Sequence, residues 1–157
     1  MIGEYKKIVP VMNSANIGTS SDTDSINMSG YHKATFIFIC GTVTTDITFT
    51  PKSGAGEGTK TTAVPSYYAV SGAIIGTAVA ASTASCDVLS AWTSSATTHV
   101  TTANSNLMYV IEIDASDMTD GEEWLTITLT TATGGIVHCV AILEPRYSEN
   151  RSGTCLK

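Results

Sequence analysis

Residues 33–51 read KATFIFICGTVTTDITFTP and contain the clearest strand signals in the chain. The first eight residues (33–40) are apolar at nearly every position and rich in β-branched and aromatic side chains, which is typical of a central strand covered on both faces. Residues 43–50 alternate between apolar and polar side chains. This period of two is typical of a strand with one buried and one hydrated face, and Pro51 is expected to end it.

The same two patterns recur in the second half of the chain. Residues 124–130 (WLTITLT) alternate, and residues 136–143 (IVHCVAIL) are almost continuously apolar. Gly41 lies between the first two strands, and Gly134 and Gly135 lie between the last two. Because glycine accepts the positive φ angles that tight turns require, the sequence predicts two antiparallel hairpins.

Further strands are expected at residues 8–12, 66–70, 97–102 and 107–113, the first of them at a sheet edge because Pro10 has no amide proton. Thr, Ser, Val, Ile and Gly dominate the composition, which favours strands and turns over helices. The 157 residues have the length of one domain. We therefore predict a single all-β domain, an antiparallel β-sandwich or jelly roll of about seven to nine short strands.

The charge pattern excludes nucleic acid as an expected partner. The net charge is −6, and only eight lysines and arginines are present, whereas nucleic-acid binding requires clustered basic side chains. Residues 64–84 carry no charge but contain Pro65, Gly72 and Gly76 and few large apolar side chains, so no membrane span is expected. The N-terminus does not resemble a secretory signal, which indicates synthesis in the cytoplasm.

Cys40, Cys86, Cys139 and Cys155 stand singly, without the CxxC spacing that supplies two zinc ligands from one turn. Cys40 and Cys139 lie inside apolar strands, where free thiols behave as small hydrophobic groups. Free cysteines are the favoured interpretation, and disulfides or a metal site are the alternatives.

No catalytic, cofactor-binding or metal-binding residues are predicted. The glycine-rich residues 53–61 lack the adjacent Gly-Lys of a phosphate-binding loop, because Thr59 intervenes, and no helix is expected to follow. His32, His99 and His138 are far apart in sequence, and His138 is interpreted as a core or interface residue because it alternates with apolar neighbours. The chain is therefore not expected to be an enzyme.

Two binding hypotheses remain open. The densest carboxylate cluster could bind calcium, although its spacing does not match a calcium loop and its residues can cap a helical turn instead. Four aromatic residues could stack on a sugar ring if two of them are exposed on one face. The acidic residues are Asp114, Asp117, Asp120, Glu122 and Glu123, and the aromatic residues are Tyr67, Tyr68, Trp92 and Trp124.

Six motifs in a fixed order resemble those of small virion proteins of tailed bacteriophages. They are IVPV (residues 8–11), DSINMSGY (24–31), KATFIFICG (33–41), YVIEID (109–114), WLTITLT (124–130) and AILEPRY (141–147). The resemblance implies a capsid decoration (cement) protein on the virion surface that binds and stabilises the shell of the major capsid protein. It also implies a homo-oligomer, either a trimer or a dimer. The alternatives are a tail or other head component, or a glycan-binding sandwich module.

The two ends of the chain are expected to form extended arms. Residues 1–31 and the tail at residues 148–157 are largely polar and cannot bury much apolar surface alone. We expect one of these segments to reach across to another subunit.

Overall fold

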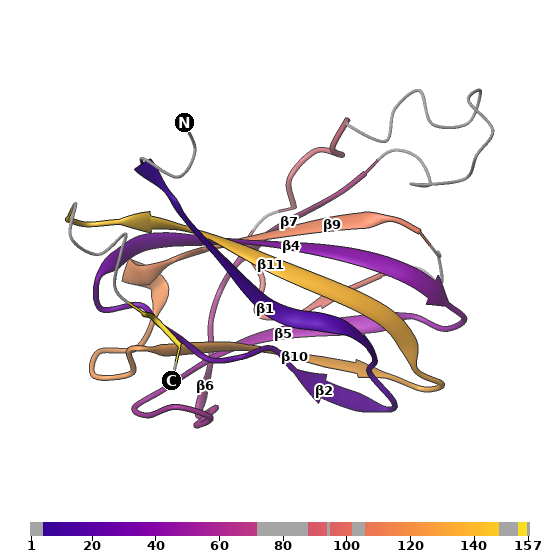
Figure 1. The fold of residues 1–157 in the computed structure, drawn as a ribbon, viewed down its shortest axis with the longest axis horizontal. Helices are drawn as coiled ribbons and strands as arrows, with labels where there is room; N and C mark the ends of the chain where they lie inside the picture. Colours follow the sequence, from indigo (N-terminus) through magenta and orange to yellow (C-terminus); the bar gives the residue numbers. More distant parts are fainter. Residues whose placement is uncertain (1–4, 72–87, 94, 102–105, 148–153, 157) are drawn as a thin grey trace.

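The computed structural model describes residues 5–71, 88–93, 95–101, 106–147 and 154–156. Two antiparallel sheets lie one above the other (Figure 1). Sheet A has the order β1 (Lys7–Asn16), β11 (Gly135–Pro145), β4 (Tyr31–Val43), β9 (Met108–Asp114) and β7 (Tyr67–Val70). Sheet B contains β2 (Ser20–Asp22), β10 (Trp124–Thr131), β5 (Ile47–Gly54) and β6 (Thr62–Ala63), with β3 (Ile26–Asn27) beside β10 and β8 (His99–Val100) beside β5. The prediction of an all-β sandwich is confirmed.

The described residues contain eleven strands rather than seven to nine. Four of them, β2, β3, β6 and β8, are only two or three residues long, which is too short for an alternation pattern to reveal. Pro51 does not end β5, which continues to Gly54. Proline is tolerated there because Pro51 lies between the residues of β5 that pair with β8 (48–49) and those that pair with β6 (52–53), so neither pairing needs its amide proton. Its carbonyl oxygen accepts a hydrogen bond from the Val64 amide at 3.0 Å.

The prediction of two hairpins is wrong. β4 and β5 lie in different sheets, as do β10 and β11, so each pair is joined by an arch that crosses the sandwich. Instead, β4 pairs with β11 and β5 pairs with β10. Gly41 lies inside β4 rather than at a turn, because the strand continues to Val43, which pairs with Gly135.

Threonine side chains join the two arches to each other. The Oγ1 atoms of Thr44 and Thr133 are 2.7 Å apart, and those of Thr45 and Thr131 are 2.8 Å apart. Gly134 adopts a φ of +85°, a conformation that suits glycine. The arches therefore stack on one another. This stacking brings β4 beside β11 in one sheet and β5 beside β10 in the other.

The core lies between the inner faces of the two sheets. Phe38 of β4 contacts Phe49 of β5 with ring centroids 4.7 Å apart, and Phe49 contacts Tyr109 of β9 at 5.9 Å. These separations suit aromatic pairs. Because Phe49 belongs to sheet B and the other two rings to sheet A, this cluster holds the two sheets together.

The two apolar strands β4 and β11 are central in sheet A, but they are covered on the inner face alone. Ile39, Ile136 and Val140 point away from sheet B and are 45%, 43% and 36% exposed. His138 is also exposed on this outer face, so it is not a core residue, and its interpretation as an interface residue stays a prediction. The continuous apolar pattern therefore does not reflect burial on both sides.

Most of the N-terminal segment is part of the sandwich and not an arm. β1 is an edge strand that pairs with β11 along its length, as Pro10 predicted, and Val9, Ile17 and Ile26 are buried in the core. At the other end, Cys155 is 5% exposed, and its carbonyl oxygen accepts a hydrogen bond from the Asn27 amide at 3.0 Å. Residues 7–31 and 154–156 therefore pack on the sandwich of their own chain, while residues 1–4, 148–153 and 157 lie outside the described part.

Candidate functional site

The structure brings one serine and one histidine together, but at a buried position. The Ser66 Oγ atom lies 2.8 Å from Nε2 of His99, and the two residues are 1% and 5% exposed. Tyr68 stacks on the His99 ring at 5.0 Å, and burial lowers the pKa of His99, against a smaller opposing effect of a hydrogen bond with the Ser66 backbone. This pair connects β8 to the start of β7 and has no access to a substrate, so its geometry is that of a structural contact.

The described cysteines are buried thiols. Cys40, Cys139 and Cys155 are not joined in disulfides. Burial raises the pKa of Cys40 to about 12 and that of Cys139 well above its usual value. Because the thiolate is the reactive and metal-binding form, Cys40 and Cys139 act as small core residues. Cys86 lies outside the described residues.

The glycine-rich residues 53–61 connect β5 to β6, as expected. No helix follows them, and Lys60 binds Asp22 instead of facing an open loop. The Thr59 amide donates to the Gly56 carbonyl oxygen at 3.0 Å. A side-chain Cβ at Gly54 would overlap both the carbonyl and the hydroxyl oxygen of Thr59. The segment is therefore a tight turn packed against the end of its own strand.

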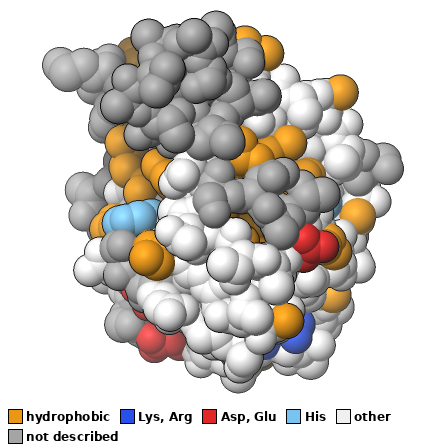
Figure 2. All heavy atoms as spheres, turned by 90° about the vertical axis from the view of Figure 1, so that its right-hand side faces the viewer, with side chains coloured by type: hydrophobic (Ala, Val, Ile, Leu, Met, Phe, Trp, Pro, Cys, Tyr) orange, Lys and Arg blue, Asp and Glu red, His pale blue; other side chains and the backbone are white. Residues whose placement is uncertain are grey.

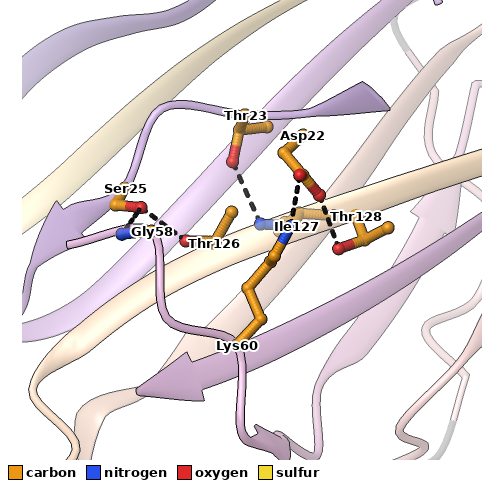
Figure 3. Close-up of polar contacts among 8 residues, drawn as sticks. All are labelled: Asp22, Thr23, Ser25, Gly58, Lys60, Thr126, Ile127 and Thr128. Carbon is orange, nitrogen blue, oxygen red and sulfur yellow. Dashed lines mark hydrogen bonds and ion pairs between the residues drawn. The ribbon is translucent and has the colours of Figure 1, made fainter. Parts of the chain in front are cut away.

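Lys60, Asp22 and Thr128 form a polar contact on the outer side of sheet B (Figure 3). Asp22 accepts hydrogen bonds from Lys60 and, at 2.7 Å, from the Thr128 hydroxyl. Burial opposes ionisation of Asp22, but these two hydrogen bonds together with the positive charges of Lys60 and Lys52 outweigh it and lower its pKa. The contact ties β2, β10 and the turn before β6 together.

A second set of contacts, also drawn in Figure 3, fixes residues 23–25 on β10. The Ser25 Oγ atom lies 2.7 Å from Oγ1 of Thr126 and accepts a hydrogen bond from the Gly58 amide at 3.1 Å. The Thr23 hydroxyl accepts from the Ile127 amide at 3.0 Å. Thr126 is consequently 1% exposed, so the threonine side of β10 is not hydrated along its whole length as the alternation predicted.

The acidic loop is organised as a capped turn beside an open pocket. Asp114 caps η1 (Ala115–Asp117) by accepting hydrogen bonds from the Ser116 amide and hydroxyl at 2.9 and 2.7 Å, and these bonds lower its pKa. Glu122 accepts from the hydroxyls of Ser53 at 2.6 Å and Thr62 at 3.2 Å. The adjacent pocket of about 360 Å³ is lined by this loop and by residues that include Arg146.

The calcium hypothesis gains no support from this loop. In the described residues, no three side chains among His, Cys, Asp and Glu gather in a way that could hold a metal ion. Asp114 and Glu122, two members of the acidic cluster, are instead occupied by hydroxyl and amide donors of the chain itself.

The aromatic residues are divided between core and surface. Trp124 is 9% exposed, and Tyr68 packs between His99 and Tyr109. Tyr67 and Trp92 are both exposed, and the amide of Thr93, next to Trp92, donates to the Tyr68 carbonyl at 2.9 Å. Two of the four candidate rings are therefore exposed near one edge of sheet A, and the other two are core residues.

A group of exposed aliphatic side chains lies on the outer face of sheet A. Strand pairing places Ile8 of β1, Ile136 and Val140 of β11 and Ile39 of β4 on this face, and all four side chains are exposed. We call these four residues the outer patch; the exposed His138 lies among them, opposite Ile39 in the strand pairing. The charge pattern of the sequence does not reveal the outer patch. The nearly uninterrupted apolar runs of β4 and β11 do indicate it, because they place apolar side chains on both faces of the sheet.

Charged groups frame the outer patch at one end. Lys6 forms an ion pair with Glu144, and Lys33 forms one with Glu112 at 3.3 Å. Elsewhere, charged side chains are sparse on the end of the sandwich where β4 ends, which Figure 2 shows.

Helices in the described ranges are too short to cross a membrane.

Comparisons with known proteins relate the chain to others by fold. No protein-family model matches the sequence, and no curated protein matches it either. Among solved structures, the SPBc2 prophage-derived protein YomS is 14% identical, with 88% of this chain and 91% of YomS covered and a TM-score of 0.51. YomS and this chain therefore share a fold over most of their lengths.

Two further solved structures are more distant. A protein of the Bacillus endospore appendages, described as disulfide-linked pili, is 14% identical, with coverage of 89% and 86% and a TM-score of 0.44. A Tobacco streak virus coat protein dimer is 10% identical, with coverage of 91% and 88% and a TM-score of 0.33. Neither similarity is close enough to carry an argument about function.

Proposed function

We propose that this chain is a non-enzymatic structural subunit of a bacteriophage particle, and specifically a capsid decoration protein that binds the shell of the major capsid protein. The observation that carries the structural role is the outer patch, an exposed apolar surface suited to assembly with another protein surface. The chain pairs the buried hydroxyls of Ser25 and Thr126 with each other, yet it leaves four large aliphatic side chains exposed on one sheet face. Contiguous exposed apolar surface is typical of protein-binding sites.

Two further observations support a virion role. The fold is shared with YomS, a protein that is itself derived from a prophage. The ordered motifs that resemble phage virion proteins also fall on strands that build the sandwich, including β1, β4, β9, β10 and β11. Buried free thiols suit synthesis in the host cytoplasm, where cysteines remain reduced.

An enzymatic role is disfavoured by the geometry of the Ser66–His99 pair. A nucleophile and its base must reach a substrate, and these side chains are almost fully buried. The buried pair instead resembles a satisfied core contact.

The test is addition of the purified protein to shells assembled from the major capsid protein alone. We expect saturable binding and a higher melting temperature of the shells, with electron microscopy locating the subunit on the capsid exterior. Binding to tails but not to shells would replace decoration with the tail alternative. Absence from purified particles would refute the virion role altogether.

A glycan-binding module is the second candidate, and the exposed rings of Tyr67 and Trp92 favour it. Exposed aromatic rings can stack on the apolar face of a sugar. A glycan array probed with the wild-type protein and with Trp92→Ala tests this role. Retention of wild type but not of Trp92→Ala supports it, whereas failure of wild type to bind any glycan removes it.

A further inference from the structure

We propose that the outer patch is a self-association site, at which sheet A of a second copy of this chain packs face to face around a two-fold axis. The inference deepens the proposed function by naming one partner. Only the occurrence of this dimer in a phage particle rests on the proposed function. Three properties of the described residues support it: the state of the sheet edges, the charge around the patch and the area of the patch.

The sheet edges are poorly suited to pairing with another chain. In β1, Pro10 removes an amide donor, the register shifts on either side of Met12, and the Val11 carbonyl oxygen is occupied by the Asp24 amide at 2.8 Å. Such features protect edge strands from intermolecular pairing.

The remaining edges are covered or short. β7 receives hydrogen bonds from the Ser90 and Thr93 amides along its outer side. The outermost strands of sheet B, β2 and β6, are three and two residues long. Association through the exposed face is therefore favoured over association through an edge.

The charges beside the outer patch allow two copies to approach. The ion pairs Lys6–Glu144 and Lys33–Glu112 cancel within each chain, so the net charge of −6 is carried outside them. Asp114, at the same end of the sheet, is bound by Ser116. A second copy of an acidic chain meets less like-charge repulsion on this neutral face than on the rest of the surface, and an acidic or basic partner gains no attraction there.

The area fits a small symmetric interface. The patch covers three strands, and strand spacings of about 4.8 Å and rises of about 3.4 Å over about seven residues give roughly 340 Å². A standard interface buries roughly 800 Å² on each partner, of which somewhat more than half is apolar. The patch can thus form most of the apolar centre of such an interface, which predicts a reversible dimer of modest affinity. A two-fold axis lets the same patch serve both copies.

The substitution Ile136→Lys tests this assignment, with Ile8→Lys as a second variant at another position of the patch. Val100→Lys is the matched control, because Val100 is a 57% exposed apolar residue on β8 of sheet B. Circular dichroism and thermal melts establish that each variant is folded. Sedimentation velocity over a wide range of protein concentration then gives the dimer dissociation constant.

We expect the wild type and Val100→Lys to dimerise with the same dissociation constant, and each patch variant to weaken the dimer at least about tenfold, because a charge would be buried without a partner. A wild type that stays monomeric at every concentration would overturn the inference, as would patch variants that dimerise like wild type. Binding to bare shells is measured separately. Monomeric patch variants that still bind shells would support self-association at this face, whereas variants that keep the dimer but lose shell binding would assign the patch to the capsid protein and overturn it.

Discussion

The contact between Ser25 and Thr126 offers the sharpest test of whether the N-terminal segment belongs to its own sandwich. Ser25→Ala removes the 2.7 Å contact with Thr126 and the 3.1 Å hydrogen bond from the Gly58 amide. With each hydrogen bond contributing about 1 kcal/mol net, this change should lower the free energy of unfolding by about 2 kcal/mol. Thr126→Val keeps the side-chain shape and removes one bond, at a cost of about 1 kcal/mol.

The double variant Ser25→Ala with Thr126→Val should cost about 2 kcal/mol, not the sum of the two, which corresponds to a coupling energy of about 1 kcal/mol. Urea unfolding followed by tryptophan fluorescence measures all four proteins, since Trp124 is buried next to Thr126. As a control, Ser20→Ala on the exposed start of β2 should be additive with Thr126→Val.

A coupling energy below about 0.3 kcal/mol would refute the contact. A coupling that changes with protein concentration would refute its location within one chain, because a segment contributed by another subunit makes stability depend on concentration.

Three other changes probe the scaffold. Phe49→Ala should cost about 3–5 kcal/mol in chemical unfolding because this ring of sheet B packs against two rings of sheet A, and a cost under about 1 kcal/mol would contradict that role. Gly134→Ala should lower the melting temperature, since it forces a side chain to φ +85° and places a Cβ 2.7 Å from the Asn16 amide oxygen; an unchanged melting temperature would contradict this. Stability should also fall as the pH drops below the ordinary His99 pKa of 6.5, because burial lowers that pKa in the folded state and the unfolded chain therefore binds the proton first. The fall should persist in His138→Gln and be absent in His99→Gln, and an equal fall in both variants would contradict its assignment to His99.

The sequence predicted the elements better than their partners. Alternation placed Ile47 and Phe49 on the buried face of one strand, and Pro10 marked the edge strand; both are confirmed. The hairpins were wrong because a link of three residues fits either a turn within one sheet or an arch between two sheets. Only the contacts between distant arches, such as Thr44 with Thr133, decide between them.

The candidate site was harder to predict, because exposure depends on what lies above a strand. The apolar run of β11 was interpreted as covered on both sides, yet Ile136 and Val140 are exposed on its outer face. Conversely, Thr126 was expected to be hydrated and is buried beneath residues 23–25 and the Gly58 turn. Neither outcome is encoded in the local pattern, since each depends on segments distant in sequence.

The sequence by itself determined that this chain forms short antiparallel strands around an aliphatic and aromatic core, because side-chain period and turn residues act locally. The tertiary structure alone decided that the strands flanking each short link belong to opposite sheets, that the polar N-terminal segment is bound to β10, and that one apolar face is left open. The reason is physical: strand formation depends on neighbours along the chain, whereas burial depends on the long-range contacts that close the sandwich.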